Sequence, residues 1–332
     1  MISRREFSQL AVVAAVSLSG CASTQALRTS TAGSHESFVA LKQVKAGLLN
    51  VGYAEDGPAG GPPVVLLHGW PYDIHSYADV APLLAANGYR VIVPYLRGYG
   101  TTAFLSSDTF RNGQQSAVAL DVIALMDALQ IPKAVLGGFD WGSRTAAIVA
   151  ALWPERCKAL VAVSGYLITD RTANLQPLAP QAEYGWWYQY YFATDRGVEG
   201  YRRYTRDFNK LIWKTASPKW NFDDATYDRT AASFTNPDHV AIVIHNYRWR
   251  LSLANGEPQY DPIEQQLSAM PVITVPAITI ASDFDGPAAD GTSYRSKFAG
   301  KYAHRFLPGI GHNVPQEAPQ DFANAVVEVD GY

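Results

Sequence analysis

The chain has 332 residues, of which 48% are hydrophobic and 17% are charged, so it can bury a large core. The formal net charge of −3 provides no basic field, and nucleic acid is therefore not an expected partner. Two cysteines exclude a fold that depends on a framework of disulfides.

Residues 1–36 have the pattern of an export signal and linker. The apolar run 10–18 is too short for a membrane-spanning helix, which needs about 20 residues, and is typical of a secretory signal. The stretch SRREF, beginning at Ser3, resembles a twin-arginine motif for the export of folded proteins. The stretch LSGC, ending at Cys21, resembles a bacterial lipobox, whose cysteine carries a lipid anchor; cleavage near Ala26 is the alternative. We therefore expect an exported protein, periplasmic or membrane-anchored.

Strands alternate with helices in the rest of the chain. Two short alternating runs within 38–54 predict antiparallel strands. Apolar runs that end in turn residues predict buried strands in the segments 62–71, 89–100, 133–140, 157–165, 275–286 and 303–313. Apolar residues at helical spacing predict helices in the segments 116–131, 144–154 and 318–329. This alternation predicts an α/β fold with a mostly parallel sheet flanked by helices.

The pattern changes between residues 166 and 261. This segment is rich in Trp, Tyr and Arg, has helical periods and contains no buried strand. We interpret it as a helical lid inserted into a core made of 37–165 and 262–332. A cleft between the lid and the core is then the expected binding site.

Side chains that can act as acids, bases or nucleophiles follow three of the predicted strands, which is where α/β sheets place their active sites. Asp140 lies in GFDWG, Asp283 and Asp285 follow a late strand, and His312 follows the last strand. GFDWG resembles the strand-to-helix elbow G-x-S-x-G of α/β-hydrolases, with aspartate in place of serine, and the order nucleophile, acid, histidine is that of their catalytic triad.

An aspartate at this position predicts attack on a saturated carbon. Its ester keeps the carbonyl on the enzyme, so water activated by His312 can attack that carbonyl and free the product, whereas a serine would form a stable ether. The backbone N–H groups of Trp70 and Trp141 are expected to hold the oxyanion on Asp140. This chemistry needs no metal and no organic cofactor.

Four motifs carry a closer resemblance: HGWP from His68, RGYG from Arg97, DWG from Asp140, and the pair Gly311-His312 followed by NVPQEAP. With them, the chain from about Phe38 onward resembles the epoxide hydrolase and haloalkane dehalogenase branch of the α/β-hydrolases. The resemblance implies the α/β-hydrolase fold and covers most of the core. The motifs do not separate the two activities, because both groups use Asp-Trp-Gly.

The resemblance implies that residues of the lid distinguish epoxide hydrolases from haloalkane dehalogenases. Epoxide hydrolases have two lid tyrosines that donate hydrogen bonds to the epoxide oxygen, and the matching positions are Tyr188, in YQYYF, and Tyr247, in NYR. The family pattern G-x-x-D, with Ser282 in the glycine position, selects Asp285 as the acid that orients the histidine, and Asp283 is the alternative.

We therefore predict hydrolysis of a small apolar or aromatic epoxide to a vicinal diol. A haloalkane dehalogenase with the same mechanism is the first alternative, with Trp70 or a lid tryptophan as the second halide donor. A haloacid dehalogenase fits less well, because Trp141 replaces the first of its two arginines and Arg144 alone matches the second. A non-catalytic, ligand-binding lipoprotein is the alternative from another class. The oligomeric state has no signature in the sequence.

Overall fold

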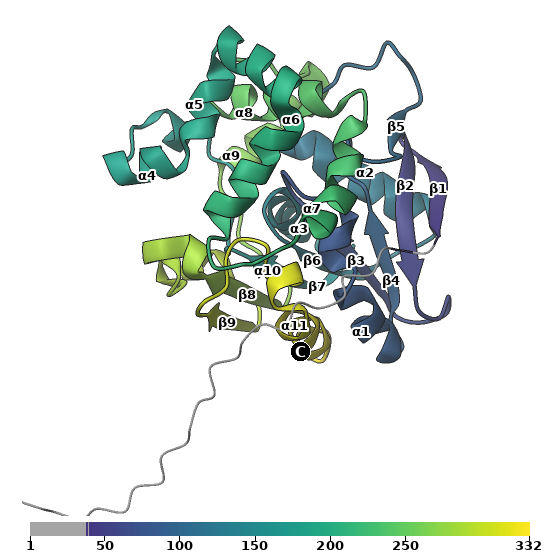
Figure 1. The fold of residues 1–332 in the computed structure, drawn as a ribbon. Coiled ribbons are helices and arrows are strands. Elements are labelled where there is room, and N and C mark those ends of the chain that lie inside the picture. Colours follow the sequence, from purple (N-terminus) through teal and green to yellow (C-terminus); the bar gives the residue numbers. More distant parts are fainter. Residues whose placement is uncertain (1–37, 39) are drawn as a thin grey trace, which may run out of the picture. The chain divides into compact units, whose positions relative to one another are not determined.

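The computed structural model describes residue 38 and residues 40–332 (Figure 1). The expected export signal, with Cys21, lies outside these residues. Over the described range, no helix is both long and apolar enough to cross a bilayer.

One sheet organises the described chain. Its strands are β1 (Leu41–Ala46), β2 (Leu49–Asp56), β3 (Pro63–Leu67), β4 (Arg90–Pro94), β5 (Ala103–Phe104), β6 (Ala134–Gly138), β7 (Cys157–Val163), β8 (Ala277–Ser282) and β9 (Tyr302–Leu307). The strand order is β1-β2-β4-β3-β6-β7-β8-β9, with β5 on β2. The pairings of β1, β2 and β5 are antiparallel, and those from β4 through β9 are parallel. The expected α/β fold with a mostly parallel sheet is confirmed.

Helices cover this sheet in two pairs. The helices of the core are α1 (Val80–Ala86), α2 (Gln115–Ala128), α3 (Trp141–Leu152), α10 (Val314–Glu317) and α11 (Pro319–Asp330). Helices α2 and α3 pack on each other, as do α1 and α11, and each pair contacts strands. The central strands β3, β6 and β7 are therefore almost completely buried, which explains their apolar sequences, and only the exposed Lys158 near the start of β7 departs from this pattern. The short elements β5, α1 and α10 were not predicted, because segments of this length carry no periodicity.

Helices fill the chain between β7 and β8 and lie together in the upper part of the view (Figure 1). They are α4 (Pro180–Gly185), α5 (Trp187–Ala193), α6 (Asp195–Ala216), α7 (Asp224–Ala231), α8 (His239–Arg250) and α9 (Asp261–Ser268). We call 166–261 the lid, as the sequence suggested, although the helical region continues through α9 to Ser268.

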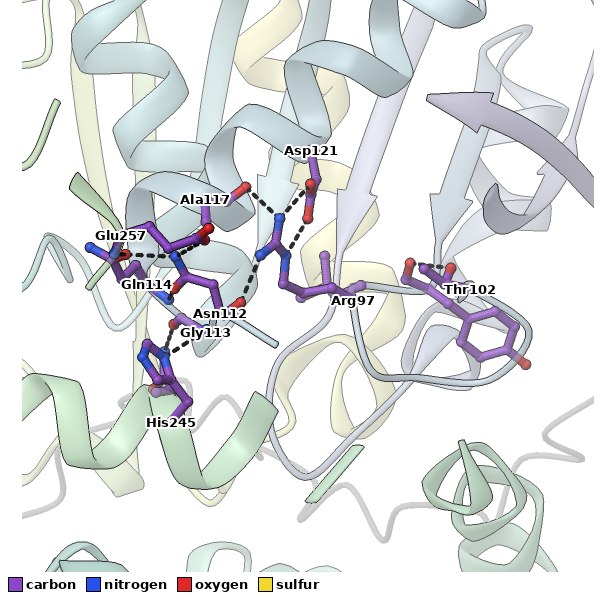
Figure 2. A network of polar contacts seen from close by, with 12 residues as sticks. Arg97, Thr102, Asn112, Gly113, Gln114, Ala117, Asp121, His245 and Glu257 are labelled. Carbon is purple, nitrogen blue, oxygen red and sulfur yellow. Dashed lines mark hydrogen bonds and ion pairs between the residues drawn. The ribbon is translucent and has the colours of Figure 1, made fainter. Parts of the chain in front are cut away.

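A polar network joins the lid to the core beside α8 (Figure 2). Buried Arg97 binds both carboxylate oxygens of Asp121, at 2.6 and 2.7 Å, and the carbonyl of Asn112 at 2.7 Å. The next residue, Gly113, donates its N–H to Nδ1 of His245 at 2.9 Å. The loop after the RGYG motif is thus fixed on the core side by an ion pair and on the lid side by α8.

Candidate active site

The conformation of Asp140 comes from the sharp turn between β6 and α3. Its φ of +53° and ψ of −124° lie outside the regions that L-residues favour, as expected of a nucleophile elbow. The turn requires glycine at position 142, because a Cβ there would lie 1.8 Å from the carbonyl oxygen of Leu67. The turn thereby presents the carboxylate at the carboxyl end of the sheet.

The Asp140 carboxylate has two different oxygens. Oδ1 accepts the backbone N–H of Trp70 at 2.7 Å, and the backbone N–H of Trp141 also bonds to the carboxylate. Oδ2 lies 3.3 Å from Nε2 of His312. Burial opposes ionisation of Asp140, but the hydrogen bond and charge of His312, the charge of Arg144 and the N–H of Trp141 outweigh it, so its pKa is lowered. The group is therefore an anion at neutral pH.

His312 faces Asp140 from the loop after β9. The ring of Phe284 lies against its imidazole, with 4.1 Å between ring centroids. Its Nδ1 is buried and has no hydrogen-bond partner among the residues that the structure describes. The hydrogen bond that Nδ1 is expected to donate to an orienting aspartate is thus not formed in this conformation.

The two candidate acids differ in what they contact. Asp283 is exposed, forms an ion pair with Lys219 at 2.6 Å, and has its pKa lowered mainly by that side chain. Asp285 is half-buried, and its Oδ2 accepts the backbone N–H of Ser282 at 2.8 Å, which holds the carboxylate at the end of β8. Burial raises the pKa of Asp285, and the charge of His312 acts in the opposite direction. Asp285 is therefore the one of the two whose pKa responds to the charge of His312, although its carboxylate makes no hydrogen bond to the imidazole in the described structure.

The two predicted lid tyrosines come together near Asp140. Tyr188, from α5, and Tyr247, from α8, have ring centroids 5.4 Å apart. Both are buried, and burial raises the pKa of each phenol, with the charge of Asp140 adding to the effect. Both hydroxyls therefore stay protonated over the pH range of most enzymes and are available as hydrogen-bond donors.

A cavity of about 260 Å³ lies beside these groups, and the buried Tyr247 is not among the residues that line it. Asp140, His312, Trp70 and Tyr188 line it together with other residues, several of them aromatic, from the lid and from the loop after β8: Gln181, Tyr184, Gly185, Trp186, Trp187, Ile212, Thr215, Ala216 and Phe284. The cavity suits a small ligand with an apolar or aromatic body.

Tyr201 is a residue of this site that the sequence analysis missed. It is buried on α6, and its hydroxyl accepts the indole N–H of Trp70 at 2.8 Å. The indole N–H of Trp213 donates to the carbonyl of Pro71 at 2.8 Å. The indole N–H groups of Trp70 and Trp213 are therefore already used in hydrogen bonds within the protein, and neither is free to bind a departing halide. No spacing pattern in the sequence marks Tyr201.

Arg144 is buried, and its charge acts on Asp140. Its Nε donates to the carbonyl of Leu167 at 3.0 Å, and burial lowers its pKa to about 10. It remains a cation at neutral pH and supports the ionised form of Asp140. Across the described residues, no group of three or more His, Cys, Asp or Glu side chains is arranged to hold a metal ion.

Comparison with known proteins gives a consistent result. Residues 62–239 match the family model described as alpha/beta hydrolase fold. The crystal structure of a candidate epoxide hydrolase from Klebsiella pneumoniae subsp. pneumoniae MGH 78578 is 59% identical, has a TM-score of 0.87, and covers 90% of this chain and 100% of its own.

Curated relatives include both expected activities. A haloalkane dehalogenase from Mycobacterium marinum is 36% identical over 126 residues, which is 37% of this chain and 41% of that protein. Epoxide hydrolase B from Mycobacterium tuberculosis is 32% identical over 151 residues, or 42% of each chain. The chain thus spans about two fifths of the length of these curated relatives.

Proposed function

The chain belongs to the α/β-hydrolase fold family, and from this premise we propose that it hydrolyses epoxides to vicinal diols through an ester on Asp140. Relatives named as epoxide hydrolases and as a haloalkane dehalogenase support a hydrolase of this branch. In the proposed first step, Asp140 attacks one epoxide carbon and the C–O bond of that carbon breaks. The released oxygen takes a proton from Tyr188 or Tyr247.

The two carboxylate oxygens support a division of labour in this mechanism. Oδ2 faces His312, whereas Oδ1 accepts the N–H of Trp70, so we assign the ester to Oδ2. Oδ1 already accepts the N–H of Trp70 and becomes the oxyanion when water attacks the carbonyl carbon. His312 takes one proton of that water, the ester C–O bond breaks, and the leaving diol oxygen takes this proton back from the imidazolium. The second proton of the water remains on the Asp140 carboxyl and returns through solvent to the phenolate, so the carboxylate, the neutral imidazole and the neutral phenol are all restored.

The observation that favours an epoxide over a haloalkane is the state of the donors around Asp140. Two protonated phenols meet there, and a phenol is suited to an oxygen that stays in the product. A departing halide instead requires two weak N–H donors, and the indole N–H of Trp70 is already bound to Tyr201. The aromatic cavity supports a small apolar or aromatic substrate. We also propose that residues 166–261 act as a lid over this substrate and that residues 37–165 and 262–332 form the core.

The direct test is product analysis of the purified enzyme. Racemic styrene oxide and a panel of aliphatic epoxides are expected to yield diols, detected by chiral chromatography. In His312→Gln, the ester is expected to accumulate as added mass on the peptide that contains Asp140. An absence of diol from every epoxide in the panel contradicts the proposed activity, and an absence of the mass shift contradicts the covalent mechanism.

Haloalkane dehalogenation is the second candidate, and one feature favours it. The indole N–H of Trp141 is buried and makes no well-formed hydrogen bond within the described structure, so it can donate one hydrogen bond to a halide. A haloalkane panel assayed for bromide release decides between the two candidates. We expect release at least about tenfold slower than diol formation, because loss of one anion-stabilising donor typically reduces the rate by about 10²–10³-fold.

Export and lipid attachment at Cys21 remain proposals that rest on the sequence. Cell fractionation and intact mass of the mature protein test them. A mature chain that begins at lipidated Cys21 is the expected result, and a chain cleaved near Ala26 and recovered in the periplasm supports the alternative.

A further inference from the structure

A single carboxylate, that of Glu317, organises the loop that carries His312. Oε2 accepts the backbone N–H of Gly311 at 2.7 Å. Oε1 accepts the backbone N–H of Asn313 at 3.1 Å and the hydroxyl of Ser217 at 2.7 Å. The hydroxyl of Ser217 in turn accepts the backbone N–H of His312 at 2.9 Å. Three consecutive N–H groups, at positions 311–313, are thus fixed directly or through one hydroxyl.

Glu317 has none of the cationic partners that a half-buried carboxylate usually has. In the described part of the chain it forms no ion pair with Lys or Arg. Burial raises its pKa, while the bonds from Ser217, Gly311 and Asn313 and the charge of His312 oppose that rise. Because an unpaired buried charge is costly, the carboxylate depends on its hydrogen bonds, and the loop depends on the carboxylate.

The contact also joins the lid to the histidine loop. Ser217 is the buried residue that ends α6, and the carbonyl of the residue before it, Ala216, accepts the N–H of His312 at 3.2 Å as well. The approach is so close that a Cβ on Gly311 would lie 2.4 Å from the hydroxyl oxygen of Ser217. Only glycine fits there, and this close packing explains why a glycine precedes His312 in the motif.

We propose that Glu317 is a positioning residue for His312, which it holds at Asp140 by binding the histidine loop and the end of α6 together. The proposal rests on the proposed function, because it assigns Glu317 to the step that His312 performs. It also accounts for how the imidazole is held although its Nδ1 has no described partner. The position of the loop backbone, rather than a hydrogen bond from Nδ1 to an aspartate, sets where the side chain lies in this conformation.

This role predicts an effect on one half of the reaction. Ester formation uses Asp140 and the lid tyrosines, whereas ester hydrolysis needs His312 at the right distance from the attacking water. Misplacement by about 1 Å can slow a step by about 10²-fold. Weakening the contacts of Glu317 should therefore slow hydrolysis by about 10²-fold and leave ester formation within about twofold.

The test uses Glu317→Gln, in which an NH₂ group replaces one acceptor and faces an N–H of the loop. Rapid quench of the full chain with styrene oxide, followed by intact mass, measures the rate of ester formation and the steady-state fraction of ester. The ester fraction is expected to rise from a minor to the major species, while kcat falls and KM falls with it. Ser217→Ala, which removes only the hydroxyl, is expected to give the same pattern at about one tenth of the size.

Glu264→Gln is the matched control. Glu264 is also a half-buried carboxylate with a raised pKa that accepts a backbone N–H and a serine hydroxyl, both from Ser116, but it lies away from the His312 loop. Its variant is expected to keep the wild-type ratio of the two rates. Equal slowing of both steps in Glu317→Gln and in Ser217→Ala, or no change in either step, overturns the positioning role.

The two proposals fail in different ways. If wild type yields no diol and His312→Gln yields no ester, the proposed function is wrong. If both behave as expected but the Glu317 variant does not accumulate ester, the function stands and the positioning role is wrong.

Discussion

The sheet side and the lid side of the pocket hold their polar groups by different means. On the sheet side, the strained backbone of Asp140 and the N–H of Trp70 set the position of the carboxylate. On the lid side, Tyr188 and Tyr247 come from separate helices and are held by ring packing around Trp70, at 5.0 and 5.2 Å between centroids. The sheet side is fixed by local chain geometry, and the lid side by contacts among distant side chains. Substitutions should therefore abolish function on one side and reduce it by degrees on the other.

The largest expected effect is on the sheet side. Asp140→Ala should lower kcat by about 10⁴–10⁶-fold, because no other described group replaces the nucleophile. Asp140→Gly should be equally inactive but more stable by about 1 kcal/mol or more, because glycine relieves the positive φ. Urea denaturation and diol assays on the same preparations measure both. If Asp140→Gly is inactive without a gain in stability, the backbone strain at this position is smaller than we infer.

The lid tyrosines should give smaller, graded losses. Tyr247→Phe and Tyr188→Phe should each slow ester formation by about 10²–10³-fold, because each removes one donor to the developing alkoxide while the other remains. Quenched-flow measurement of the ester isolates this step. Tyr184→Phe is the matched control, since Tyr184 also lines the cavity but its side chain is 74% exposed, and we expect less than about a twofold change. A wild-type rate of ester formation in both single variants excludes the tyrosines as donors.

The same contrast explains what could be predicted from sequence. The strand-and-loop pattern predicted the sheet and the placement of Asp140 and His312 at its edge, because these depend on residues close together in the chain. Tyr188 and Tyr247 could be assigned only through family resemblance, since nothing local brings α5 to α8. Tyr201 and Phe284 were missed, because their roles arise from packing against Trp70 and His312. Spacing alone left Asp283 and Asp285 as alternatives for the acid that orients the histidine, and both stay candidates, because neither carboxylate bonds to Nδ1 of His312 in the described structure.

Tyr201 lies where the two sides meet, and its removal should have an intermediate effect. Tyr201→Phe leaves the indole N–H of Trp70 without its acceptor, so we expect a loss of about 1–3 kcal/mol in the free energy of unfolding. Freed from this bond, the indole should also allow weak halide binding, seen as inhibition by bromide that wild type lacks. Tyr227→Phe is the control, because Tyr227 is also buried in the lid but its hydroxyl donates to the carbonyl of Arg206. Bromide inhibition of both variants alike would falsify the link to Trp70.

The smallest expected effect concerns the pH dependence of stability, which two buried histidines, one on each side of the pocket, allow to be compared quantitatively. His68 in the core accepts the N–H of Leu96, and His239 in the lid faces the carbonyl of Gly98 with Nδ1 and the hydroxyl of Tyr201 with Nε2. Burial is the main cause that lowers the pKa of His68 to about 4 and that of His239 to about 3. Both are neutral in the folded chain at pH 5, and both are protonated when unfolded.

The unfolded state therefore binds more protons below pH 6.5, and stability must fall as the pH falls. From pH 6.5 to pH 5 each histidine should remove about 1.5 kcal/mol from the free energy of unfolding. His68→Asn and His239→Gln should each flatten the pH dependence by about one proton. His75→Gln is the control of opposite sign: burial lowers the pKa of His75, but Asp73 outweighs it and raises the value. The stability that protonated His75 contributes is therefore complete below pH 6.5 and is lost as the pH rises above it. This variant should lack the gain in stability on acidification above pH 6.5 and should behave almost as wild type between pH 6.5 and pH 5. A separate early transition altered only by His239→Gln would mean that the lid unfolds before the sheet, and a single transition altered by both means that packing around Trp70 makes the two sides one cooperative unit.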